Sequence, residues 1–163
     1  MRRLTALIAL LALGLGISLS AHTVNVGTVT DVTDCFPINT YFGYSYSQQI
    51  YTQPQINHQG EISRIRFYRG YIGSLDYSDE WTIYMGHTSR SAFSSHTDWE
   101  PISNLTQVFS GSVLANFPPP GNWMEITLDT PFNYDNVSNL VLAIHENTPY
   151  WDNTLSAEWG VFN

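Results

Sequence analysis

Apolar and polar side chains alternate with a period of two along most of this chain. Trp81, Ile83 and Met85 fall on one face of their segment, the pattern of a half-buried strand. Residues 139–144 are apolar on both faces, which is expected of a central strand. No stretch has the spacing of an amphipathic helix. Strands are therefore predicted over residues 42–51, 62–68, 81–85, 105–113, 123–129 and 139–144.

Turn-forming residues separate the predicted strands, at Gly60 and in the segments 70–79, 86–101, 117–121 and 135–136. Many short strands without helices favour an all-β fold with two antiparallel sheets packed face to face, a β-sandwich of jelly-roll type. No internal repeat or linker divides the chain, so one domain is expected. Residues 159–163 have the pattern of a strand or loop that stops abruptly, which would leave an open sheet edge and suggests truncation at the C-terminal end.

The N-terminus has the pattern of a signal peptide. Arg2 and Arg3 form a basic start, residues 6–17 are apolar, and small residues follow up to Ala21. A transmembrane anchor is the alternative, but the apolar run is about a dozen residues where a span needs roughly 20. We expect cleavage of residues 1–21, a single domain over 22–163, and no membrane insertion afterwards. The protein is then exported to the cell surface or medium, with the periplasm as the other possibility.

Charge and cysteine content narrow the partners. The formal net charge is −8, and loss of Arg2 and Arg3 with the leader lowers it to −10. The sequence has no lysine, so the basic footprint that nucleic acids or anionic lipids require is missing. Cys35 is the only cysteine, so no disulfide can form within the chain. The domain must depend on its apolar core, for which its length and 43% hydrophobic content suffice.

Several short motifs occur together and in order, and they point to a family. They are residues 44–51 (YSYSQQIY), 60–68 (GEISRIRFY), 83–88 (IYMGHT), 109–111 (FSG), 123–134 and 139–147. With these motifs the chain resembles a β-sandwich module that recurs in exported multidomain proteins of Bacteroidetes-like bacteria. The resemblance covers residues 26–163 and implies an accessory module, frequently found beside fibronectin type III-like domains, proteases or a C-terminal sorting domain. The chain departs from that family in lacking the further strands and the sorting domain.

No catalytic constellation is predicted, so the protein is not expected to be an enzyme. Glu125 and Asp129 share one strand face, but four residues of strand place them about 13 Å apart, beyond the ~5 to 9.5 Å of glycosidase acid pairs. A solvated strand face is the better interpretation. His145 and Glu146, at the end of the buried strand, form the most site-like pair, and a structural role is favoured for the histidine. Ser110 lacks a nucleophile elbow.

Three acidic residues, Asp76, Asp79 and Glu80, cluster in one predicted loop. Loop oxygens of this kind can hold Ca²⁺, although the spacing is not that of an EF-hand. A stabilising calcium ion is one hypothesis and a solvated acidic loop is the favoured one. No other cofactor is expected.

Aromatic residues provide the candidate binding site. Stacking on sugar rings or docking of a protein needs exposed aromatic faces, for which the loop residues Tyr71, Tyr77, Trp99, Tyr150 and Trp151 are candidates. The alternative is that these rings pin the loops onto the sandwich.

Three functions therefore compete. The favoured hypothesis is a non-catalytic accessory or interaction module of an exported surface protein, with a protein or glycan at the cell surface as its partner. A carbohydrate-binding module that uses loop aromatics is the alternative, and a fragment of a secreted hydrolase is the third.

Overall fold

The computed structural model describes residues 21–27, 29–34, 36–70, 73–151 and 159–162. The expected signal peptide lies outside these residues except for Ala21, as do Cys35 and Tyr71. Within the described part no helix is long and apolar enough to cross a membrane. The strands are β1 (Val29–Asp34), β2 (Tyr46–Tyr51), β3 (Gly60–Tyr68), β4 (Glu80–Thr88), β5 (Thr106–Ser112), β6 (Trp123–Tyr134), β7 (Asn139–Glu146) and β8 (Trp159–Phe162). One helical turn, α1 (Gln53–Ile56), and two 3₁₀ turns, η1 (Ile102–Asn104) and η2 (Leu114–Asn116), complete the elements.

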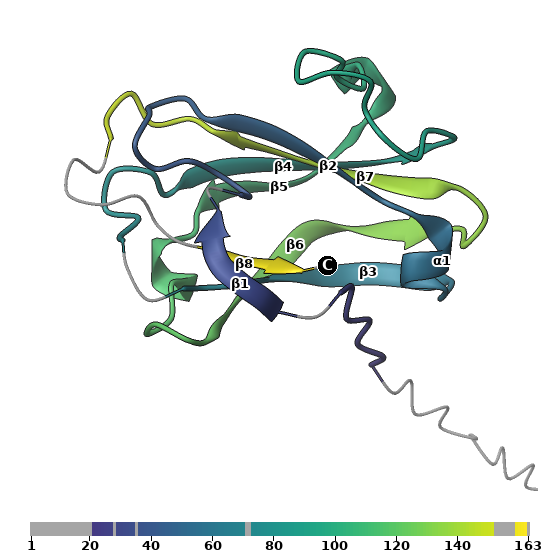
Figure 1. Cartoon of the computed structure of the whole chain (residues 1–163), viewed down its shortest axis with the longest axis horizontal. Coiled ribbons are helices and arrows are strands. Elements are labelled where there is room, and N and C mark those ends of the chain that lie inside the picture. Colours follow the sequence, from purple (N-terminus) through teal and green to yellow (C-terminus); the bar gives the residue numbers. More distant parts are fainter. Residues whose placement is uncertain (1–20, 28, 35, 71–72, 152–158, 163) are drawn as a thin grey trace, which may run out of the picture.

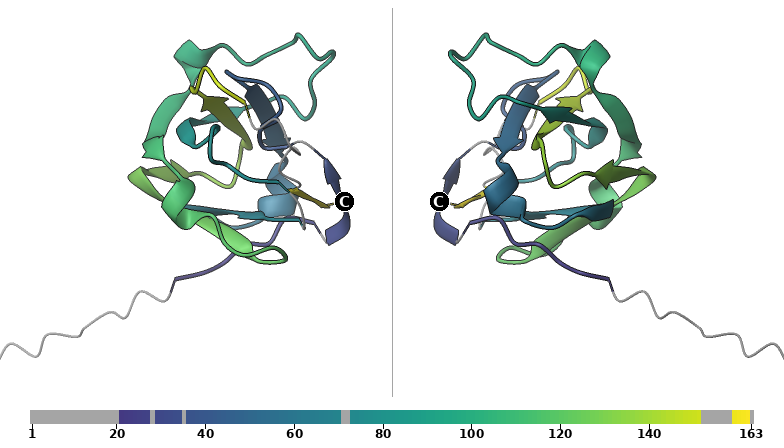
Figure 2. Two further views of the ribbon diagram at one scale, coloured as in Figure 1. Left: turned by 90° about the vertical axis from the view of Figure 1, so that its left-hand side faces the viewer. Right: turned by 90° about the vertical axis from the view of Figure 1, so that its right-hand side faces the viewer.

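The strands form three antiparallel sheets. One has the order β2-β7-β4-β5, the second pairs β3 with β6, and the third pairs β1 with β8. Figure 1 shows the four-stranded sheet as one layer, with β3 and β6 as the facing layer. In the end views of Figure 2, β1 and the C-terminal strand lie on one side of the molecule and β5 and β6 on the other. The predicted all-β, antiparallel class is confirmed, and the two layers are consistent with a sandwich.

Alternating side chains of the two layers fill the space between them. The four-stranded sheet contributes the inward residues Trp81, Ile83 and Met85, all at most 1% exposed. From the opposite layer, Met124 and Ile126 of β6 are equally buried. Each is two positions from the next, as the pleat of a strand requires, so the predicted alternation in these two segments is confirmed.

Strand β7 lies between β2 and β4 and is covered on both faces, as its sequence predicted. Its inward residues join the core, while Val141 and Ala143 are 0% exposed on the outer face. The segment between β4 and β5, residues 89–105, covers this outer face and is here named the cover loop. A Cβ atom on Gly86, the neighbour of Val141 across the ladder, would lie 2.5 Å from Cδ2 of Leu105. The loop and the sheet are therefore in direct contact at Gly86.

The predicted start of one strand was wrong, and two elements were not predicted. Strand β2 begins at Tyr46 rather than at residue 42, because the backbone first turns at Asn39 and then takes the left-handed conformation at Tyr44 (φ 60°). The chain also contains the helical turn α1, where Thr52 N donates a hydrogen bond to Oε1 of Gln55 at 2.8 Å. Residues 29–34 form a strand that the alternation did not predict, and it pairs with β8 at the chain end.

Candidate functional site

Three loops meet at one end of the four-stranded sheet. Tyr46 at the start of β2 pairs with His145 near the end of β7, and Trp81 near the start of β4 pairs with Glu146. Because these ladders are antiparallel, the segments before β2, before β4 and after β7 all leave the sheet at the same end. Hydrogen bonds join them: Tyr44 N donates to Thr148 O at 3.1 Å.

Among the described residues of these three loops, six aromatic side chains are each 54–63% exposed. We name the group the aromatic end; it consists of Tyr41, Phe42, Tyr44, Tyr77, Tyr150 and Trp151. Two pairs within it are in edge contact: Tyr77 and Tyr150 with ring centroids 6.5 Å apart, and Tyr41 and Phe42 at 5.2 Å. The rings of each pair are inclined by 68° and 86°, so neither pair makes a coplanar platform.

The backbone beneath the aromatic end is tightly packed. A Cβ atom on Gly43 would lie 3.0 Å from the carbonyl oxygens of Thr148, Pro149 and Tyr150. The absence of a side chain at Gly43 therefore lets the first loop approach the third. Gly43 thus brings the backbone between Phe42 and Tyr44 next to the backbone of residues 148–150.

Glu146 supports the same loops from below. Its side chain is fully buried, and it accepts a hydrogen bond from Thr148 N. Its Oε2 atom and Oγ1 of Thr148 are buried without a hydrogen-bond partner among the described residues. His145, its predicted companion, points to the other face, where its ring lies edge-on to Tyr46 at 5.7 Å. The two residues form no common site.

The structure therefore brings together three of the five predicted aromatic candidates, Tyr77, Tyr150 and Trp151. It adds Tyr41, Phe42 and Tyr44, which the sequence interpretation missed because Phe42 and Tyr44 were assigned to a strand and Tyr41 was not considered. Gly43, which follows Tyr41 and Phe42 and precedes Tyr44, was the feature of the sequence that could have indicated a loop here. Tyr71 lies outside the described residues.

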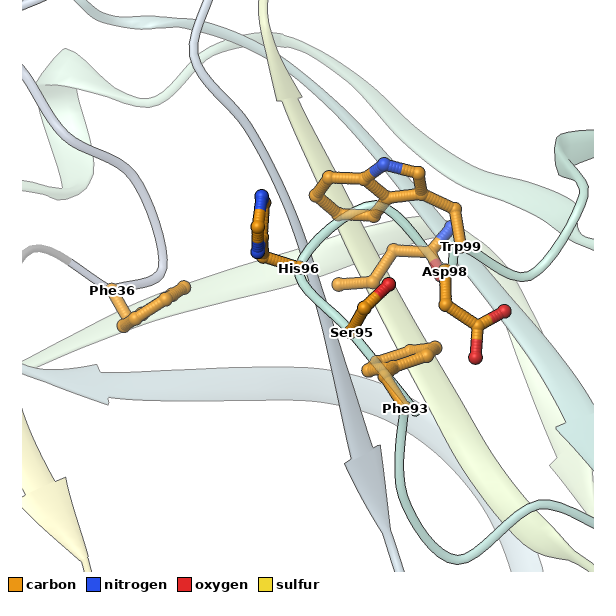
Figure 3. Close-up of a pocket in the computed structure, with 7 residues that line it drawn as sticks. Phe36, Phe93, Ser95, His96, Asp98 and Trp99 are labelled. Carbon is orange, nitrogen blue, oxygen red and sulfur yellow. The ribbon is translucent and has the colours of Figure 1, made fainter.

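Trp99 belongs to a different surface, a pocket of ≈310 Å³ beneath the cover loop. The pocket is lined by Phe36, Gln48, Phe93, Ser95, His96, Asp98 and Trp99. In the view of Figure 3, Phe36 and His96 lie on one side, and Phe93 and Trp99 on the other, with Ser95 between the latter two. Trp99 is 42% exposed and is backed by Tyr46, with ring centroids 5.0 Å apart.

An ion-pair network holds the cover loop in shape. The Arg90 guanidinium forms ion pairs with Asp98 and, at 3.7 Å, with Glu100. Asp98 Oδ2 also accepts hydrogen bonds from the hydroxyl and backbone N of Ser94 at 2.6 and 2.9 Å. These Ser94 bonds, together with Arg90, lower the pKa of Asp98 from 3.8 to about 2.

The buried side chain of Gln48 fixes the loop to the sheet. Its Oε1 accepts from Glu100 N and its Nε2 donates to Glu100 O, both at 2.8 Å. A second donation at 2.8 Å reaches the hydroxyl of Tyr46. Gln48, which lines the pocket, is thus held by three hydrogen bonds within the protein.

The acidic candidates do not converge. Asp76 and Glu80 are exposed, and Asp79 accepts a hydrogen bond from the hydroxyl of Ser112. Within the described residues no group of three or more His, Cys, Asp or Glu side chains could hold a metal ion. The described residues thus bring together no set of carboxylates for the Ca²⁺ ion, and the calcium site stays a prediction.

Glu125 and Asp129 each have their own partner. Glu125 forms ion pairs with Arg66 at 2.5 Å and Arg64 at 3.2 Å, both on the neighbouring strand β3. Asp129 Oδ2 accepts a hydrogen bond from Ser110 N at 2.9 Å. Glu125 is therefore neutralised by two arginines, a feature that the interpretation as a solvated face did not include.

No family model, curated protein or solved structure matches this chain.

Proposed function

We propose that this protein is a non-catalytic interaction module of an exported protein and that it binds its partner through the aromatic end. The observation that carries the proposal is the gathering of six exposed aromatic side chains from three loops. Large aromatic side chains on adjoining loops are the residue type that dominates the energy of recognition sites. Single exposed apolar residues would need no such explanation, but six on three adjoining loops do.

Export, the cell surface as location and the jelly-roll topology belong to this proposal. The pattern of residues 1–21 supports export, and the resemblance to accessory modules of Bacteroidetes-like surface proteins supports the location. The net negative charge of the mature chain disfavours nucleic acids and anionic lipids as partners. A protein or a glycan of the cell surface is the remaining class of partner.

The hydrolase alternative requires acids, a nucleophile or a metal ligand set to converge. The best acid pair of the sequence has separate partners in Arg64, Arg66 and Ser110. The alternative of a carbohydrate-binding module is favoured by a different feature, the pocket at Trp99.

The aromatic end can be tested with the mature chain, residues 22–163, carrying a fluorescent label. The probe is the isolated cell envelope of a Bacteroidetes bacterium, and the measurement is the fraction of protein that sediments with it. We expect saturable binding that falls at least tenfold in the variant Tyr77→Ser/Tyr150→Ser/Trp151→Ser. Loss of these rings removes apolar contact area and leaves the sheets intact, because all three side chains are more than half exposed.

The matched control replaces three exposed apolar side chains that lie elsewhere, in the variant Ile102→Ser/Leu114→Ser/Val137→Ser. It should bind like the original protein. Equal binding by both variants, or no saturable binding by the original protein, would overturn the proposal. Circular dichroism and thermal unfolding verify that all three proteins are folded.

A further inference from the structure

We infer that the pocket beneath the cover loop binds a single neutral pyranose ring, as the terminal residue of a glycan. This site is separate from the aromatic end, so either can fail its test without the other. The inference rests on the size, wall chemistry, charge and rigidity of the pocket.

Size limits the occupant to one small ring. A volume of ≈310 Å³ is at the lower end for ligand pockets, which run from about 300 to 1,000 Å³. One sugar ring or one amino-acid side chain fits this space, whereas an oligosaccharide would have to extend out of it. An interior residue of a glycan would have to leave the pocket at two linkages and a terminal residue at one, so the pocket favours the terminal residue.

The walls match the two kinds of surface that a pyranose presents. Phe36, Phe93 and Trp99 offer aromatic rings on which the C–H face of a sugar can pack. Ser95 and His96 lie among these rings and add a hydroxyl and an imidazole that can hydrogen-bond sugar hydroxyls. The Ser95 hydroxyl also contacts Oγ1 of Thr97 at 3.2 Å and accepts from Thr97 N at 3.4 Å, so a sugar hydroxyl would be an additional partner there. An apolar side chain of a peptide would make no hydrogen bond with the His96 imidazole.

Charge favours a neutral ligand over an anionic or cationic one. The Asp98 carboxylate at the rim is already neutralised by Arg90, so it offers a cation little additional attraction. An anionic sugar would meet a protein of formal net charge −8 before the leader is lost. The hydrogen bonds from Ser94 and the ion pair with Arg90 all involve Oδ2 of Asp98. The other carboxylate oxygen, Oδ1, can accept a hydrogen bond from a neutral hydroxyl.

Two of the aromatic walls, Trp99 and Phe93, are held in place in advance. Trp99 rests on Tyr46, and the loop that carries it is fixed by Gln48 through two hydrogen bonds to Glu100. Arg90 lies over the Phe93 ring at 5.1 Å. A pocket that needs little ordering loses less entropy when a small ligand binds.

The test is a ¹⁵N NMR titration of the mature chain with the methyl glycosides of glucose, galactose, mannose and N-acetylglucosamine. We expect at least one glycoside to shift the amide signals of residues 93–99 saturably, with a Kd of about 1 mM, as a single small ring permits. Trp99→Ala should weaken binding at least tenfold, whereas Trp99→Phe, which keeps a ring, should lose less. Ser95→Ala should weaken glycoside binding without disturbing the fold.

Trp151→Ala is the matched control, because Trp151 is an exposed tryptophan of the aromatic end, and it should bind glycosides like the original protein. The amide spectrum verifies the fold of each variant. No saturable shift with any glycoside overturns the inference. Saturation by N-acetylphenylalanine amide in place of the glycosides overturns it as well, in favour of a peptide side chain.

Discussion

Trp159 of β8 packs against Trp81 of β4, with ring centroids 5.9 Å apart and ring planes inclined by 61°. Both side chains are at most 1% exposed, and Phe67 of β3 lies 6.2 Å from each ring. The three rings come from three different sheets. They join the C-terminal strand to the core of the two main layers.

Replacement of Trp159 should therefore destabilise the whole domain. Trp159→Ala is expected to lower the free energy of unfolding by about 3–5 kcal/mol, because a large buried ring leaves a cavity. Urea denaturation of the mature chain provides the measurement. Trp151→Ala, at an exposed position, should stay within about 0.5 kcal/mol of the original protein. Similar losses in both variants would show that β8 does not carry this part of the core.

Gly86→Ala should disturb the contact between the cover loop and the sheet. The added methyl group would meet Leu105 Cδ2 at 2.5 Å and Asn104 O at 3.0 Å, so we expect a loss of about 1–3 kcal/mol in stability. The double variant Gly86→Ala/Leu105→Ala should lose less than the sum of the two single variants, because the shorter side chain makes room. Strict additivity in denaturation experiments would contradict the close approach.

Asp98 should titrate well below an ordinary aspartate. Hydrogen bonds from Ser94 and the charge of Arg90 lower its pKa to about 2. A carbon-detected NMR titration measures this value directly, and Ser94→Ala should raise it toward 3.8. An Asp98 pKa near its ordinary value in the original protein would mean that the bonds to Ser94 do not persist in solution.

The same shift makes a pH-dependent contribution to stability. The pKa in the folded state is below that of the unfolded chain, so the contribution is present above pH ~4 and is lost as the pH falls toward 2. The denaturation midpoints of the original protein and Asp98→Asn should therefore converge between about pH 5 and pH 2. A difference that does not change with pH would contradict this prediction.

Glu146 should matter for the aromatic end through its hydrogen bond to Thr148 N. Glu146→Ala leaves that part-buried donor without its partner and should cost about 1 kcal/mol. Glu146→Gln keeps an oxygen acceptor and should cost less. Thermal unfolding distinguishes the two variants, and hydrogen exchange at Thr148 reports the bond itself. Equal stability of both variants would show that the bond to Thr148 is not the reason for burying this side chain.

The sequence predicted the strands that face the core and missed β1. Met124 and Ile126 reveal an inward face by their spacing alone, since the pleat of a strand repeats every two residues. Strand β1 carries no comparable signal, and its partner β8 lies at the other end of the chain. Long-range contacts decide which segments pair, and the sequence of one segment does not specify its pairing partner.

The candidate site was predicted only in part for a related reason. The sequence alone does not distinguish exposed aromatic residues from buried ones. Phe42 and Tyr44 were therefore assigned to a predicted strand. Only the close approach of Gly43 to the 148–150 backbone brings that loop beside the loop that carries Tyr150. The pocket at Trp99 likewise requires Phe36, which lies far from residues 93–99 in the chain.

By itself the sequence determined the all-β, antiparallel class, because the alternation of side chains is a local property of an extended backbone. It also determined the acidic charge and the lack of disulfides. The tertiary structure alone decided the pairing of the chain ends, the burial of Trp159 and the gathering of three loops at one end. These features depend on which distant segments bury their apolar surfaces against one another. The local pattern of apolar residues indicates that a side chain is buried, but it does not indicate the partner against which the side chain packs.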